Sequence, residues 1–222
     1  MVKCYNCGIE ISKKNGNQTK EHIPAKNLFE GYDDKYKNNR ITVPSCLVCN
    51  NGSIDLDNEF RDMIGTISNH NELNVIAKNT VKSIFHYNKQ YNRLHINKSG
   101  EVTGVTFNKR LILDNHKKIF KGLFYDQYKK PIGSEYHIVS TVDPTDQTQM
   151  FVAYLQHNFK WKCSGHPDVF EYILQPFREN FDNPSKKDLK YKDGERAYLG
   201  LLKYNQSHVA LVFATNKHPM SV

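Results

Sequence analysis

Apolar residues recur at helical spacing in three stretches of the first 130 residues. The first stretch begins at Ile54 and carries Phe60 and Ile64 on one stripe. A hydrophobic repeat close to 3.6 residues predicts an amphipathic helix. Residues 72–94 show a second stretch of this kind, and KRLILDNHKKIFKGLFYDQY, residues 109–128, shows a third.

Beyond Pro131 the pattern changes to short runs rich in β-branched and aromatic residues. EYHIVSTV, MFVAYL, VFEYIL, RAYLGLLKY and HVALVFAT are separated by Gly, Pro, Asn and Asp. Such runs are typical of strands that alternate with turns. We therefore expect a mostly antiparallel sheet here. SGEVTGVTF, before the third helix, predicts a turn and a short strand.

The first 52 residues have few periodic runs and are rich in Asn, Lys, Gly and Cys. This composition favours a small irregular module held by a metal. Together the patterns predict an α+β protein in three parts. These are an N-terminal module over 1–70, a helical segment over 71–130 and a β-rich region over 131–222.

Neither a targeting segment nor a membrane span is evident. The start, MVKCYNCGIE, has no apolar core of the kind that a signal peptide needs. No run approaches the roughly 20 apolar residues of a membrane helix. We therefore expect a soluble cytoplasmic protein.

The net charge of +8 is concentrated in the middle of the chain. Residues 71–130 hold twelve Lys and Arg against four Asp and Glu, whereas acidic and basic residues balance on both sides. A basic segment of this length indicates a polyanionic partner. A merely solvated, lysine-rich surface is the alternative.

Three basic residues in this segment are candidate nucleic-acid contacts. Lys82, Lys89 and Arg93 interleave with aromatic residues at 85, 87 and 91. Aromatic rings and cations can bind bases and phosphates together. The alternative is that the apolar members pack inward while the basic ones face solvent.

Four of the five cysteines form two C-x-x-C pairs, Cys4 with Cys7 and Cys46 with Cys49. In a reducing compartment such pairs indicate zinc rather than disulfides. Four thiolates suit a closed, structural Zn²⁺ site. The 38 residues between the pairs exceed the roughly 15–20 of a zinc ribbon, so a further segment is inserted. Four unrelated buried thiols are the alternative.

The inserted segment contains TKEHIPAKNLF, which places Glu21 beside His22. An isolated Glu-His dipeptide indicates only a surface pair. Here the dipeptide lies between two cysteine pairs, and Asn50 directly follows the second pair. A carboxylate, an imidazole and an amide beside a metal-held turn are therefore candidates for a site.

The order C-x-x-C, acidic residue and His, then C-x-x-C-Asn resembles the HNH, or ββα-metal, endonucleases. The variant with two zinc knuckles is similar to phage endonucleases that resolve branched DNA and to many bacterial HNH proteins. EHIPAKNLF, ITVPSCLVCNNG and DLDNEF carry the likeness, which covers roughly residues 1–62. The resemblance implies a zinc-stapled ββα-metal module within residues 1–70.

Functional roles follow from the resemblance. His22 matches the general base that activates water. Glu21 and Asn50 match the ligands of a catalytic divalent ion, and oxygen ligands suit Mg²⁺ or Mn²⁺. The four cysteines match the structural zinc ligands.

Two family positions fit less well. The Asn that orients the base usually lies on the strand before the second knuckle, where Asn38 or Asn39 is a loose match. The last metal-ligand position, one turn after Asn50, falls on Ile54. Three acidic residues are open candidates for the missing oxygen: Asp55, Asp57 and Glu59.

The expected function is a metal-dependent endonuclease that hydrolyses phosphodiester bonds, with DNA as the expected substrate. This reaction needs a deprotonated water and a cation for the developing charge, and a neutral imidazole can take the proton. The alternative is a catalytically inactive, zinc-dependent module that binds nucleic acid or protein.

Overall fold

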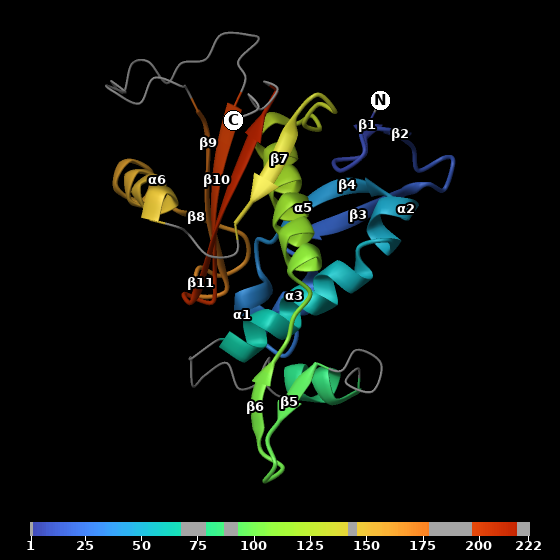
Figure 1. Ribbon diagram of the computed structural model, residues 1–222. Helices are drawn as coiled ribbons and strands as arrows, with labels where there is room; N and C mark the ends of the chain where they lie inside the picture. The colour runs from blue at the N-terminus through green and yellow to red at the C-terminus, as the bar shows by residue number, and fades with distance from the viewer. Residues whose placement is uncertain (1, 68–78, 87–92, 142–145, 178–196, 217–222) are drawn as a thin grey trace.

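The computed structural model describes residues 2–67, 79–86, 93–141, 146–177 and 197–216 (Figure 1). Within these residues no helix is both long and apolar enough to cross a membrane. Helices and strands both contribute to the fold, as the α+β prediction requires. The helices are η1 (Lys26–Phe29), α1 (Asp34–Lys37), α2 (Leu47–Asn51), α3 (Ile54–Ile67), α5 (Lys109–Tyr128) and α6 (Asp146–Asn158).

A five-stranded antiparallel sheet forms from residues 137–215, which confirms the prediction of an antiparallel sheet beyond Pro131. Its strand order is β7-β11-β10-β9-β8, and each neighbouring pair is antiparallel. The strands are β7 (His137–Ser140), β8 (Lys162–Cys163), β9 (Phe170–Pro176), β10 (Ala197–Tyr204) and β11 (His208–Thr215).

One of the runs expected to be a strand is a helix, so that prediction was wrong. MFVAYL, residues 150–155, lies within α6. Phe151, Val152 and Leu155 pack with Leu199 and Leu211 of the sheet. Spacings of one and four residues place the three helical side chains on one face. Figure 1 shows α6 and α5 on opposite sides of the sheet.

A hairpin followed by two helices forms the N-terminal region. Strand β3 (Gln18–Ile23) pairs antiparallel with β4 (Ile41–Cys46). Helix α2 follows β4 directly, and α3 begins three residues after α2 ends. Before the hairpin, β1 (Val2–Lys3) pairs with β2 (Glu10–Ile11).

Helix α5 occupies the centre of the molecule, between this hairpin and the large sheet (Figure 1). Its bounds match the third predicted helix, and its inner face buries Ile119, Phe120 and Leu123. Gly122 lies against Ile23 of β3, where a Cβ atom would collide with the Ile23 side chain. One apolar core therefore runs from the N-terminal region across α5 to the sheet.

The second predicted helix, over 72–94, is described only in part. Residues 79–86 are helical, but Leu94 opens strand β5 (Leu94–Ile96) instead of ending a helix. Strand β5 pairs with β6 (Val102–Val105), which confirms the turn and strand expected there. The division of the chain at residues 70 and 130 stays a prediction.

Candidate metal centre and the two faces of strand β3

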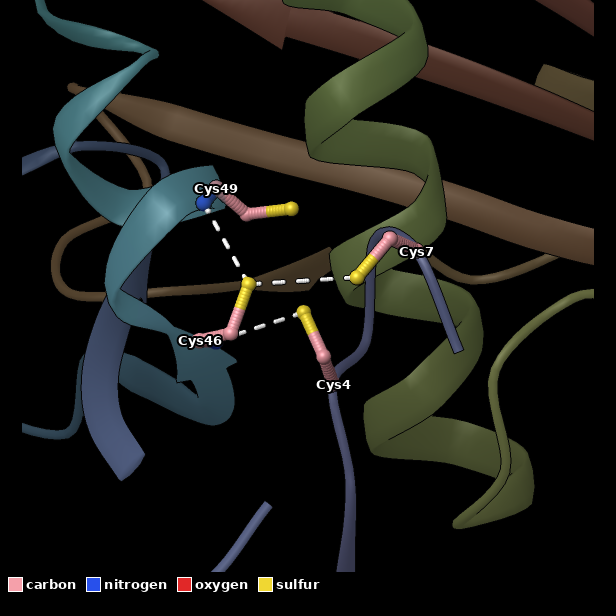
Figure 2. Close-up of side chains that lie close together, drawn as sticks. All are labelled: Cys4, Cys7, Cys46 and Cys49. Atoms are coloured by element: carbon pink, nitrogen blue, oxygen red, sulfur yellow. Dashed lines mark hydrogen bonds between the residues drawn. The ribbon is translucent and has the colours of Figure 1, made fainter. Parts of the chain in front are cut away.

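The four paired cysteines come together at the N-terminal end of helix α2. The ligand atoms of Cys4, Cys7, Cys46 and Cys49 all lie within 4.8 Å of one another. Figure 2 shows the sulfur atoms turned toward one another, with the Sγ atoms of Cys7 and Cys46 3.8 Å apart. These four residues are close enough to hold one metal ion.

Backbone N–H groups point at the sulfur atoms of this cluster. The Cys46 N–H donates to Cys4 Sγ at 3.3 Å, and the Cys49 N–H donates to Cys46 Sγ at 3.3 Å. Burial raises the pKa of the Cys4 thiol, but hydrogen bonds from the backbone of Cys7, Cys46 and Asn6 outweigh it and lower that pKa to about 7. This favours the thiolate of Cys4, which is the form that binds metal, whereas burial raises the pKa of Cys7 and of Cys49.

Local structure explains why the cluster forms here. Cys46 ends β4 and caps α2, since its side chain accepts the Cys49 N–H. The first pair lies in a tight turn that is closed by the Gly8 N–H donating to the Cys4 carbonyl at 3.0 Å. Gly8 has φ of 76°, which is in the left-handed region that glycine adopts readily.

Glu21 and His22 are neighbours on β3 but face opposite sides of the hairpin, because successive side chains alternate along a strand. Glu21 is buried together with Ile23, on the side covered by α5. His22 is half-buried, beside exposed Lys20 in sequence and opposite exposed Thr42 in register. The hairpin therefore has a Glu21 face and a His22 face.

Lys118 of α5 forms ion pairs on the Glu21 face. The Lys118 Nζ lies 3.2 Å from Glu21 Oε1 and 2.7 Å from Asp57 Oδ2. It also donates to Ser53 Oγ at 2.9 Å. Lys118 is only 4 % exposed, so one buried ammonium joins carboxylates from β3 and α3.

Several polar atoms near Lys118 and its carboxylate partners have no hydrogen-bond partner among the described residues. They are Glu21 Oε2, Asn115 Oδ1 and the Tyr5 hydroxyl. Burial raises the pKa of Glu21, and the nearby Lys118 charge lowers it in part. A buried carboxylate oxygen without a donor carries an uncompensated desolvation cost, so it is a suitable ligand for a cation.

The backbone of Asn50 is linked to the Glu21 face through Ser53. The Ser53 hydroxyl donates to the Asn50 carbonyl at 3.0 Å and also lies 3.2 Å from Asp57 Oδ2. Of the three acidic candidates on α3, Asp57 is therefore the one that shares a cation with Glu21. The Glu59 carboxylate instead pairs with Arg93, and Asp55 lies beside a separate cavity.

The His22 face is accessible and basic. Burial, followed by the charges of Arg40, Lys26 and Lys20, lowers the pKa of His22 from 6.5 to about 4. The imidazole is therefore neutral near pH 7, which is the form that accepts a proton. The same three cations would attract an anion to this face.

The structure also places the residues at the two family positions that fitted less well. Asn38 and Asn39 follow α1 and precede β4, so neither lies on the strand. Asn39 has φ of 56°, and its carbonyl accepts the Gly165 N–H at 3.4 Å. Ile54 opens α3 with its side chain largely exposed and offers no oxygen to a metal.

The three candidate nucleic-acid contacts do not share one environment. Lys82 is exposed, whereas Lys89 lies outside the described residues. The Arg93 guanidinium pairs with Glu59, and its Nη1 atom lies 3.7 Å from Asp62 Oδ2. Arg93 would have to leave these carboxylates before it could bind a phosphate.

Lys118 is the site residue that sequence reasoning missed. Its partner Glu21 lies 97 positions away in the chain, so no local motif links the two. A signal was present nonetheless, because Lys118 continues the helical spacing from Asn115 to Gly122 on the buried face. A charged residue on an apolar stripe requires a buried partner.

Comparison with known proteins adds no counterpart for this arrangement. No protein-family model, no curated protein and no solved structure matches the chain. The structure gathers Cys4, Cys7, Cys46 and Cys49 into one cluster. It also joins Glu21 to the backbone of Asn50 through Lys118 and Ser53, and it places His22 on the other side of β3.

Proposed function

We propose that this protein is a metal-dependent endonuclease of the HNH type, with DNA as its expected substrate. The order of elements supports the proposal best. A β-hairpin carrying Glu-His on its first strand leads directly into a helix, and the cysteine cluster lies at their junction. Asn50 follows the cluster on that helix, in the order that the family resemblance requires.

In this proposal the four cysteines hold a structural zinc. All four ligands are thiolates, which zinc prefers, and a site closed by four protein ligands leaves no position for substrate. Cys46 joins β4 to α2, so the metal would fix the hairpin relative to the helix that carries Asn50.

His22 is the proposed general base. Its neutral imidazole would take a proton from the attacking water, and Lys20, Lys26 and Arg40 would attract the phosphate toward the ring. No side chain or backbone group of the described residues forms a hydrogen bond with the His22 imidazole. The ring is therefore available to a water molecule.

Glu21 and Asn50 are the proposed ligands of a second ion, Mg²⁺ or Mn²⁺. Glu21 Oε2, which is buried and receives no hydrogen bond from the described residues, fits this role. Such an ion, when bound, supplies positive charge for the phosphate and the leaving oxygen. Lys118 now bridges Glu21 and Asp57, so its ammonium would have to move aside or share these carboxylates.

The test is incubation of the zinc-loaded protein with plasmid, linear DNA, single-stranded DNA and RNA. Each nucleic acid is incubated with Mg²⁺, with Mn²⁺ and with neither ion. Cleavage of at least one nucleic acid that depends on the added ion supports the proposal. Absence of cleavage under every condition contradicts it.

A catalytically inactive, zinc-dependent binding module is the second candidate. Two observations favour it. Lys118 already neutralises the Glu21 face, and Ile54 stands where the family carries a metal ligand. This candidate predicts nucleic-acid or protein binding that depends on zinc and occurs without cleavage.

A further inference from the structure

A basic groove opens beside the cysteine cluster, between the first C-x-x-C turn and the end of α5. Its volume is about 750 Å³. Lys3, Lys121, Lys129 and Lys130 line it, and no acidic side chain of the described residues does. The size falls within the roughly 300–1,000 Å³ of typical ligand sites. The four lysines indicate an anionic ligand.

The two walls of this groove are held in place. Cys7 and Gly8 of the first turn form one side, and the last turns of α5 with residues 131–134, 136 and 138 form the other. The Lys121 Nζ donates to Asn6 Oδ1 at 3.0 Å and so connects the walls. Because Asn6 lies between Cys4 and Cys7, the groove depends on the cysteine cluster for its shape.

Helix-end electrostatics explain only part of this charge. Lysines near a helix C-terminus interact favourably with the helix dipole, which accounts for Lys129 and Lys130. Lys3 comes from β1 and Lys121 from the third-last turn of α5. Their convergence on one concave surface has no such local cause.

Aromatic and apolar side chains complete the lining. Tyr125 and Tyr136 line the groove together with Ile132 and Ile138. Bases stack on aromatic rings while lysines track the phosphates, and this combination is typical of single-strand binding. The Lys129–Asp126 ion pair, at 2.9 Å, is exposed, so Lys129 can exchange its partner at little cost.

We propose that this groove binds single-stranded nucleic acid. Phosphates would lie on Lys3, Lys129 and Lys130, with a base against Tyr125. The inference rests on the proposed function, because a nuclease needs a surface that holds the strand. Binding without added Mg²⁺ or Mn²⁺ nonetheless tests the groove separately from cleavage.

The experiment measures fluorescence anisotropy of a labelled oligothymidylate of about ten nucleotides, within the roughly 4–16 that one single-strand-binding domain covers. The zinc-loaded wild type is titrated over a range of salt concentrations and compared with Lys3→Ala/Lys130→Ala. Lys13→Ala/Lys160→Ala is the matched control, because both lysines are exposed and lie outside the groove.

Removing two phosphate contacts should flatten the slope of log affinity against log salt by about 1.4 and weaken binding about 25-fold at 0.1 M salt. Tyr125→Leu should weaken binding about tenfold without changing the slope, since stacking releases no counterion. Equal effects of the groove and control pairs would overturn the proposal. So would competition by thymidine monophosphate that matches competition by the unlabelled strand.

The two proposals can fail separately. His22→Ala should bind the strand as tightly as wild type, because His22 lies outside the groove. Groove-dependent binding by a protein that never cuts would contradict the nuclease and leave the groove intact. Cleavage that survives Lys3→Ala/Lys130→Ala, together with unchanged binding, would contradict the groove alone.

Discussion

The two faces of strand β3 place neighbouring residues in opposite environments. On one face Glu21 is buried, paired with Lys118 and close to Asp57. On the other, His22 is half-buried, and its burial together with nearby cations keeps the imidazole neutral. One step along a strand thus separates a closed ionic cluster from an open basic surface.

The two faces are expected to contribute differently. The Glu21 face should contribute mainly to stability, and the His22 face should carry the proton transfer. A buried ion pair destabilises a protein strongly when one partner is removed, so the Glu21 face should determine whether the hairpin remains folded. A phosphate can reach the accessible His22 face directly, and the ion proposed at the Glu21 face would have to contact the same phosphate for a bond to be cut. Each variant below is expected to affect one face or both.

Loss of the proposed structural zinc should affect both faces and produce the largest effect. Cys46→Ser removes a ligand at the junction of β4 and α2. Because metal binding by a structural site is also folding energy, the free energy of unfolding should fall by several kcal/mol. The measurement is thermal unfolding together with zinc content by elemental analysis.

Cys163→Ser is the matched control for this substitution. Cys163 is exposed and lies outside the cluster, so its variant should retain full zinc and an unchanged melting temperature. Equal melting temperatures for the two variants would show that the cluster does not stabilise the hairpin.

Removal of the buried ammonium should disrupt the Glu21 face alone. Lys118→Met leaves Glu21 and Asp57 without their shared cation, and we expect a loss of about 3–5 kcal/mol of unfolding free energy. Lys117→Met is the control, because the Lys117–Asp114 pair is partly exposed and should contribute about 1 kcal/mol or less. Chemical denaturation measures both.

Added Mn²⁺ sharpens this experiment. If the Glu21 face can hold a divalent ion, Mn²⁺ should restore part of the stability that Lys118→Met loses, since an ion that binds only the folded state stabilises it. Lys118→Met that is as stable as Lys117→Met would mean that the ammonium does not hold this face together.

The two faces should respond to acid with opposite signs, in the smallest of these effects. His22 has a pKa near 4 in the folded state and 6.5 as reference, so the unfolded chain binds its proton first. Stability from this group is full above pH 6.5 and is lost as the pH falls toward 4. His22 is only half-buried, so solvent screening limits the effect to about 1 kcal/mol.

Glu21 has the opposite sign because its folded pKa is raised above 4.5. The folded state then binds the proton first, and this group's contribution to stability increases as the pH falls through its folded pKa toward 4.5. Unfolding free energies of wild type, His22→Asn and Glu21→Gln across this pH range test both signs. Parallel curves for all three proteins would contradict the contrast.

Sequence patterns predicted long local elements well and distant pairings poorly. The stretch that became α5 has an apolar stripe over twenty residues, enough to determine its period. The six residues of MFVAYL fit a strand or a buried helix equally. In the structure they belong to a helix that packs against Leu199 and Leu211 of the sheet. Short apolar runs therefore need tertiary information.

The candidate site shows the same limit. The spacing of the cysteines was sufficient to predict their cluster, because two C-x-x-C pairs each form a local turn. The contact between Lys118 and Glu21 was not predictable, since it depends on how α5 packs against β3 near Gly122. That packing follows from the whole core rather than from any motif.

The central claim is that His22 is the general base of the proposed nuclease. The most direct test compares plasmid nicking by wild type, His22→Ala and, as control, His157→Ala, whose histidine is exposed on α6. The account predicts that His22→Ala nicks about 10²–10⁴-fold more slowly, with unchanged zinc content and melting temperature. Nicking by His22→Ala at the wild-type rate would contradict it.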